Sequence, residues 1–175
     1  MKKFLSLVLS LVFVLLVFSG CAKSGDNDVP DNMQLASRED VTYCLYVPKT
    51  WNVNTDSGVS SAYYSTADSA NVSVMSYYPD AESMSIDDYW KLTEEAYQTN
   101  FQGYSLDSTE TTLLGGRKAG KYTFDLTVGD EQVRMMQIVA AYQSMFYIFT
   151  YTASPETFEN HLDEVQTIVD NFTFR

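Results

Sequence analysis

Two apolar runs near the C-terminus, residues 131–142 and 145–153, constrain the fold of this chain more than any other feature. The apolar part of the first is MMQIVAAY, residues 135–142, and the whole of the second reads MFYIFTYTA. Such nearly continuous apolar runs are typical of strands that are buried on both faces of a sheet. Only Gln143 and Ser144 separate the two runs, so we expect a tight turn there. The pair is therefore predicted to form a hairpin in the centre of a sheet.

Further hairpin signals surround this central pair. Gly129-Asp130 is a strong two-residue turn signal between residues 117–128 and the first apolar run. Gly115-Gly116 turns residues 104–114, which are polar and β-branched, into the same strand. Three earlier strand candidates are residues 41–47, which Pro48 ends, residues 59–65 and residues 71–78.

Two helices are expected beside these strands. Ser85 and Asp88 can form a capping box at the start of the first helix, which runs to about residue 99. Its apolar stripe is Ile86, Tyr89, Trp90, Thr93, Ala96 and Tyr97. The second helix follows the cap at Ser154-Pro155, and its stripe is Phe158, Leu162, Val165 and Val169. The predicted order is βββ-α-ββββ-α-β, an α+β fold in which helices pack on a mostly antiparallel central sheet.

The N-terminus carries a secretion signal. Lys2 and Lys3 precede a 15-residue run, residues 4–18, that only two serines interrupt. This run is shorter than the roughly 20 apolar residues of a transmembrane helix. Phe18-Ser19-Gly20-Cys21 resembles the lipobox of bacterial lipoproteins, which is lipidated on its cysteine and cleaved before it, with phenylalanine where leucine is commonest. An ordinary secretory cleavage and an uncleaved short anchor are the alternatives.

Lipidation would set both the location and the domain boundaries. A diacylglyceryl group on Cys21 supplies two acyl chains, which anchor a protein stably where a single chain is marginal. We expect residues 1–20 to be a lipoprotein signal peptide, residues 21–38 the lipidated cysteine with a flexible acidic tether, and residues 39–175 one folded domain. The expected location is the extracytoplasmic face of the cell membrane. Cys44 is then the one free thiol, and we expect it to be buried.

Composition excludes two other classes of protein. Acidic residues outnumber basic residues 23 to 11, so the chain lacks the basic surface that binds nucleic-acid phosphates. The chain is 45% apolar and contains 13 Tyr, 10 Phe and 2 Trp, which is enough apolar surface to exclude a mostly disordered protein.

The residues that usually carry chemistry are sparse. His161 is the only histidine, at the edge of the second helical stripe, and one histidine supplies neither a zinc site nor a triad by itself. We expect it to be a half-buried packing residue. The carboxylate pairs Asp87/Asp88 and Glu94/Glu95 point about 100° apart on a helix and suit a cap and a solvent face better than acid–base catalysis. We therefore expect no catalytic residue, no metal and no cofactor.

Aromatic residues suggest contact instead of chemistry. The pairs Tyr63-Tyr64 and Tyr77-Tyr78 send one ring to each face of the sheet. Most such rings are expected to pack half-buried strand surfaces, although Tyr and Trp are also enriched at interfaces. Trp51 and Trp90 are the candidate residues for contact with a partner or ligand. The alternative for Trp51 is to plug the edge of the sandwich.

Several elements together resemble the PsbP-like group. They are the Val47-Pro48-Lys49-Thr50-Trp51 step, the strand that ends in residues 147–153, the helix that contains Phe158, and the terminal Asn171-Phe172-Thr173-Phe174. This group consists of α/β/α sandwiches and includes the extrinsic photosystem II protein, a Ran-binding nuclear import factor and many bacterial lipoproteins. The resemblance covers residues 39–175 and implies an accessory or binding protein with no shared catalytic residues.

We therefore expect a lipid-anchored, non-catalytic protein that meets the membrane through Cys21 and binds or stabilises another envelope component, with a protein as the expected partner. A solute-binding lipoprotein is the main alternative, and it would need an aromatic-lined cleft with a few convergent polar groups. A hydrolase would need a nucleophile and a base that the sequence does not display.

Overall fold

The computed structural model describes residues 29–54, 59–79 and 84–175. The expected signal peptide, Cys21 and the first part of the expected tether lie outside these residues. Within the described ranges, no helix combines the length and the apolar character that a membrane span needs.

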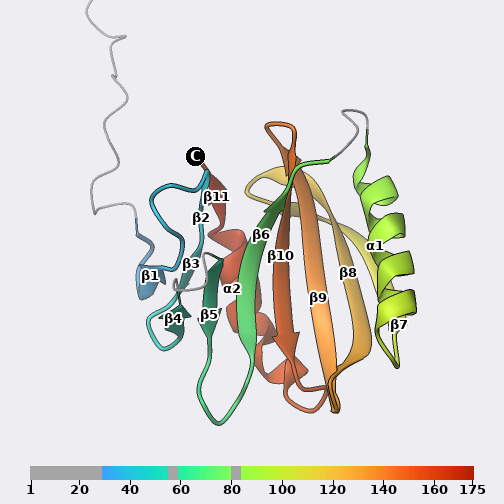
Figure 1. The fold of residues 1–175 in the computed structure, drawn as a ribbon. Helices are drawn as coiled ribbons and strands as arrows, with labels where there is room; N and C mark the ends of the chain where they lie inside the picture. Colours follow the sequence, from blue (N-terminus) through green and yellow to red (C-terminus); the bar gives the residue numbers. More distant parts are fainter. Residues whose placement is uncertain (1–28, 55–58, 80–83) are drawn as a thin grey trace, which may run out of the picture.

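A seven-stranded antiparallel sheet runs through the middle of the molecule (Figure 1). Its strand order is β4-β5-β6-β10-β9-β8-β7, which places β10 in the centre and β4 and β7 at the edges. The strands are β4 Asn52–Asn54, β5 Ser60–Tyr63, β6 Asn71–Tyr77, β7 Ser105–Leu114, β8 Arg117–Val128, β9 Glu131–Tyr142 and β10 Met145–Ala153. The predicted α+β fold with a mostly antiparallel sheet is confirmed, and the two apolar runs are adjacent strands inside that sheet.

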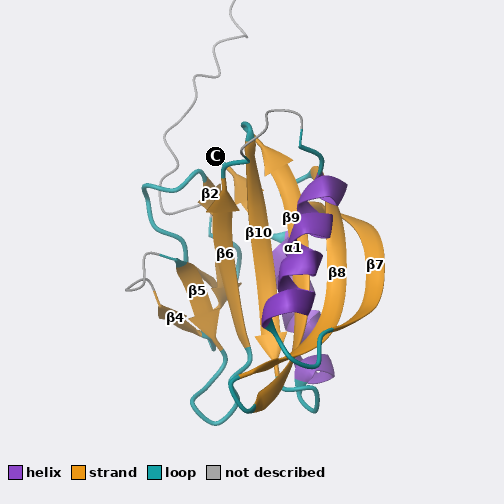
Figure 2. Ribbon diagram, turned by 45° about the vertical axis from the view of Figure 1, so that its right-hand side comes forward, coloured by secondary structure: helices purple, strands orange, loops and turns teal. Residues whose placement is uncertain are grey.

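One helix covers part of the first face of the sheet. α1, Ile86–Asn100, begins at the predicted capping box, where the Ser85 hydroxyl accepts the backbone N–H of Asp88. Trp90 of α1 stacks on Tyr122 of β8 with ring centroids 3.8 Å apart. Figure 2 shows α1 lying in front of β8 and β9.

The second helix packs on the opposite face and completes the α/β/α layers (Figure 1). A 3-10 turn, Phe158–His161, precedes it, and the α-helix itself, α2, is Leu162–Asp170. The helix therefore begins later than Ser154-Pro155 predicts, because Ser154 caps the preceding turn by accepting a backbone N–H at 3.2 Å. The side chains that α2 buries in the larger of the two cores are Val165, Ile168 and Val169.

Four short strands lie in the same layer as α2. β1, Met33–Leu35, pairs with β3, Tyr46–Pro48, while β2, Tyr43–Cys44, pairs with β11, Thr173–Phe174. The single strand predicted over residues 41–47 is therefore wrong. The chain changes partner between β2 and β3: β2 pairs with β11 near the C-terminus, whereas β3 pairs with β1.

The folded domain also begins before residue 39. Met33 is 4% exposed, and Ala36 and Ser37 are buried as well. The Ser37 hydroxyl accepts the backbone N–H of Leu45 at 3.1 Å. These residues belong to the domain and not to the tether, because they supply a paired strand and apolar side chains to the core.

The C-terminal residue closes this layer. Arg175 donates its backbone N–H to the carbonyl of Thr42 at 2.8 Å, and its guanidinium donates to the carbonyl of Glu39 at 3.0 Å. The same guanidinium lies 3.0 Å from the sulfur of Cys44. Cys44 is buried, as predicted.

The turn between β9 and β10 has an uncommon backbone. Gln143 and Ser144 have positive φ angles of 48° and 61°. A two-residue hairpin turn with φ > 0 at both central positions usually contains Asn and Gly. The left-handed conformation costs a residue with a Cβ about 1–2 kcal/mol, so the turn between β9 and β10 is strained.

We expect Ser144→Gly to raise the free energy of unfolding by about 1 kcal/mol, because glycine adopts positive φ without a Cβ penalty. Urea unfolding followed by circular dichroism measures this change. Gly116→Ser is the reciprocal control: Gly116 has a φ of 73° and a Cβ there meets no atom within 4 Å, so its cost reports the backbone alone. A destabilised Ser144→Gly variant would contradict the conformation of this turn.

Candidate functional site

Trp51 and Trp90, the aromatic residues expected to contact a partner, both lie inside the protein. Trp51 is 2% exposed and Trp90 is 6% exposed, so the expectation is corrected. Trp51 packs in the larger core against Tyr64 and His161, while Trp90 fills the core beneath α1. Each indole ring fills space within its core, and neither offers surface to a partner.

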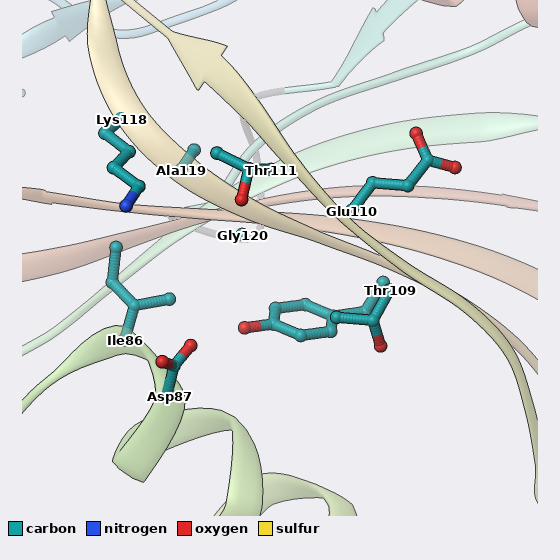
Figure 3. A pocket seen from close by; sticks show the side chains of 9 residues that line it. Ile86, Asp87, Thr109, Glu110, Thr111, Lys118, Ala119 and Gly120 are labelled. Atoms are coloured by element: carbon teal, nitrogen blue, oxygen red, sulfur yellow. The ribbon is translucent and has the colours of Figure 1, made fainter.

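A cavity of about 360 Å³ opens between the start of α1 and the strands β7 and β8 (Figure 3). Asp87 of α1, Glu110 of β7 and Lys118 of β8 line it, together with the Tyr122 ring. Figure 3 shows Lys118 extending towards the α1 side of the cavity and Glu110 pointing away from it. The lining mixes both signs of charge without converging on one point, so it lacks the few convergent polar groups of a ligand pocket.

A second cavity is closer to the aromatic-lined cleft expected of a solute-binding protein. It has a volume of about 370 Å³ and lies where the loop before β2 meets β6 and β10. Tyr43, Tyr147, Met75 and Met145 supply much of its lining, in which Asp40 is the charged residue. Thr42 and Ser76 also line it, so the cavity offers a small solute both aromatic and polar surface.

His161 connects elements that are far apart in the sequence. Its side chain is 7% exposed, with Nε2 2.9 Å from Asp68 in the β5–β6 turn and Nδ1 3.2 Å from Glu164 in α2. The Tyr64 ring lies over the imidazole at a centroid distance of 4.2 Å. Burial opposes the charged imidazole, but both carboxylates outweigh burial and raise the pKa of His161. The hydrogen bond from His161 in turn lowers the pKa of Asp68.

These contacts, which we call the His161 clamp, join the β5–β6 turn to α2 and occupy the groups that could transfer a proton. Both ring nitrogens of His161 face carboxylates, so neither is left to activate a nucleophile, which general-base catalysis requires. The histidine was expected to be half-buried, and it is buried because Asp68 and Glu164 satisfy it on both sides. In the part of the chain that the structure describes, no group of three or more His, Cys, Asp or Glu side chains is placed to hold a metal ion.

The sheet face that carries α1 is covered over only half its width. α1 lies in front of β8 and β9, and no described helix lies in front of β4, β5 and β6 (Figure 2). The strand register places ten side chains on this uncovered half, which we call the open face: Asn52, Asn54, Ser61, Tyr63, Asn71, Ser73, Met75, Tyr77, Thr150 and Thr152. The alternate residues, such as Val72 and Val74, point into the larger core.

The open face has no charged side chain, although the strands on the other half of the sheet have several. Its members are amides, hydroxyls, a thioether and two phenols. Met75 is 59% exposed, and Tyr63 and Tyr77 are each more than one-third exposed. The charged residues of β7, β8 and β9 are Asp107, Glu110, Arg117, Lys118, Lys121, Asp125, Glu131 and Arg134. The open face is therefore the candidate binding surface.

Sequence reasoning identified the tyrosine pairs but missed the open face. The Tyr63-Tyr64 pair does place one ring on each face, with Tyr63 outward and Tyr64 against His161. Which half of the sheet is exposed depends on where α1 docks. The stack of Trp90 on Tyr122 holds α1 in place, and no local sequence pattern predicts this contact. The absence of charge from β4, β5 and β6 was the one available clue.

No protein-family model and no curated protein matches this sequence. Among solved structures, cyanobacterial PsbP (CyanoP) from Synechocystis sp. PCC 6803 is similar with a TM-score of 0.59 and 15% identity, over 89% of this chain and 98% of that chain. A protein of unknown function from Pseudomonas aeruginosa gives a TM-score of 0.53 and 16% identity, over 78% of this chain and 92% of that chain. At these identities the similarity shows the fold, which is PsbP-like as the sequence resemblance predicted.

The His161 clamp should make stability depend on pH. Because the folded-state pKa of His161 is raised, its contribution is fully present below about pH 6.5, the unfolded-state pKa, and is lost as pH rises through the folded-state value. Asp68 also stabilises the folded state but with the opposite pH dependence, because its contribution is lost as pH falls through its lowered pKa. Urea unfolding between pH 5 and pH 9 should therefore show the wild type losing its advantage over His161→Gln as pH rises.

Two variants serve as controls for this measurement. Asp68→Asn removes one carboxylate from the histidine and should reduce the pH dependence, whereas Asp163→Asn changes an exposed acid of α2 and should leave it unchanged. Parallel pH profiles for the wild type and His161→Gln would show that the clamp does not contribute to stability.

Proposed function

We propose that this protein is a lipid-anchored, non-catalytic binding protein on the extracytoplasmic face of the bacterial cell membrane, and that its open face engages another component of the envelope. The open face carries the proposal. It combines exposed Tyr63, Tyr77 and Met75 with an absence of charge, and the cores of protein interfaces are enriched in Tyr and Met and depleted of charged residues.

The sequence before the domain supports the anchor. Phe18-Ser19-Gly20-Cys21 resembles a lipobox, and two acyl chains on Cys21 would hold the protein at the membrane. The net charge of −12 disfavours adhesion of the domain to an anionic lipid surface. The open face would therefore stay available to a partner instead of lying flat on the bilayer.

The described side chains support a non-catalytic role. Asp88 caps α1, Glu94 accepts a hydrogen bond from the Tyr104 hydroxyl at 3.1 Å, and His161 is held between two carboxylates. These three groups, which could otherwise act as acids or bases, are thus engaged in structural contacts. A surface function fits these residues better than hydrolysis.

A solute-binding role is the second candidate, and the aromatic cavity favours it. Tyr43 and Tyr147 line a space of about 370 Å³, within the range of small-molecule pockets, roughly 300–1,000 Å³. The hydroxyl of Tyr147 already lies 2.6 Å from the Thr42 hydroxyl, so this polar group is satisfied internally. The cavity therefore offers less specific recognition than the open face.

The anchor is tested with Cys21→Ala. The wild-type protein should partition into detergent and carry a diacylglyceryl mass on an N-terminal Cys21, because lipidation precedes cleavage at a lipobox. Cys21→Ala should remain unprocessed or be released from the membrane. Mass spectrometry and detergent phase partition measure both properties, and a soluble mature form that begins at another residue would contradict the anchor.

The open face is tested by photo-crosslinking in intact cells that produce the full-length protein with p-benzoylphenylalanine at Tyr63. A discrete adduct is expected, because Tyr63 is 37% exposed on the open face, between Asn52 of β4 and Asn71 of β6. The matched control is the same photo-reactive residue at Leu92, which is 56% exposed on α1 and lies outside the open face. No adduct from Tyr63, or equal adducts from both positions, would refute binding at this surface.

A further inference from the structure

We infer that the component bound by the open face is a neutral glycan, meaning an uncharged polysaccharide or oligosaccharide strand. This inference rests on the proposed function, because it names the chemical class of ligand for the same surface. The remaining features of the molecule point less clearly to a ligand. His161 uses both nitrogens within the protein, and the cavity beside α1 has mixed charges.

Charge is the first argument for an uncharged ligand. The chain has 23 acidic and 11 basic residues, yet β4, β5, β6 and β10 contain none of them. A phosphate headgroup or a charged peptide would lose hydration on such a surface without gaining an ion pair, which is costly. A neutral ligand loses no ionic hydration there.

The second argument is that side chains of the open face use their donors within the protein, while side-chain oxygens remain available as acceptors. The side-chain amides of Asn52 and Asn71 donate to backbone carbonyls at 3.2 and 2.9 Å, and the Ser61 hydroxyl donates to a carbonyl at 3.1 Å. Within the described residues, the side-chain carbonyl oxygens of Asn52 and Asn71 receive no hydrogen bond. Amide and hydroxyl oxygens accept hydrogen bonds, so this surface suits a ligand rich in O–H donors. Sugars are such ligands.

Tyr63 provides the third argument, because it supplies an apolar platform among these acceptors. In the strand ladders Tyr63 pairs with Asn52 on one side and Asn71 on the other, and it is 37% exposed. Adjacent strands lie about 4.8 Å apart, so the three side chains form one continuous row. A sugar ring has C–H groups on its faces and hydroxyls around its rim. An aromatic ring accepts the face, and the flanking amides can reach the rim.

An apolar partner fits this surface less well. Most of the open face consists of hydroxyl and amide side chains, and apolar cover would leave these groups buried without partners. The large apolar side chains Met75 and Tyr77 lie towards one end of β6, where Tyr77 already packs on Tyr89 of α1. A sheet face of this composition therefore favours a polar, uncharged strand.

The test uses the mature lipidated protein in a detergent whose head group contains no sugar. Isothermal titration calorimetry is carried out with three neutral hexasaccharides: cellohexaose, chitohexaose and mannohexaose. At least one should bind saturably, and Tyr63→Ala should weaken that binding about tenfold or more, as loss of a central contact does at interfaces. Tyr63→Phe keeps the ring and should retain most of the affinity.

Tyr78→Ala is the matched control, because it removes a 65% exposed tyrosine that follows β6 outside the open face, and it should bind like the wild type. The inference is overturned if none of the hexasaccharides binds, if Tyr63→Ala binds normally, or if an anionic hexasaccharide of hyaluronan binds equally well. If a protein adduct still forms from Tyr63 in cells, the proposed function stands and only the glycan is wrong. If no adduct forms from Tyr63, the proposed function fails as well.

Discussion

The burial of β10 is the constraint on which the rest of the structure depends. β10 pairs with β6 on one side and with β9 on the other along nearly its whole length. Phe146 and Ile148 belong to the core beneath α1, whereas Tyr147, Phe149 and Tyr151 belong to the core beneath α2. One strand therefore contributes to both cores. A charge at any of its buried positions would be expensive in either layer.

The long strands that tight turns join were predictable from the sequence, and the pairing of the short strands was not. The predicted bounds of β8, β9 and β10 agree with the observed bounds, because two-residue turns separate these strands. A short final strand was expected around Phe172 and Phe174 and is present as β11. Its pairing with β2 at the other end of the domain was not predicted, because a strand of two residues shows no periodicity. β1 was hidden for the same reason, since its three residues lie in a polar stretch and find their partner only in β3.

The candidate site was also predictable only in part. Alternation along β5 correctly predicted that Tyr63 and Tyr64 face opposite sides, because this depends only on the local backbone. A tryptophan after a strand gives no such information, and Trp51 turned out to be buried. The clamp on His161 could not be predicted either, because Asp68 lies 93 residues away in the sequence. The open face exists because α1 docks over one half of the sheet, which only the tertiary structure determines.

The short ladder of β1 has a mechanical consequence. A chain held from its N-terminal side delivers any pull to β1, which is joined to β3 by only three residue pairs. In the centre of the sheet the ladders are longer, with seven pairs between β6 and β10 and nine between β10 and β9. Tension would peel β1 away before it reached these ladders. The first strand would then detach under load while the central sheet keeps its shape.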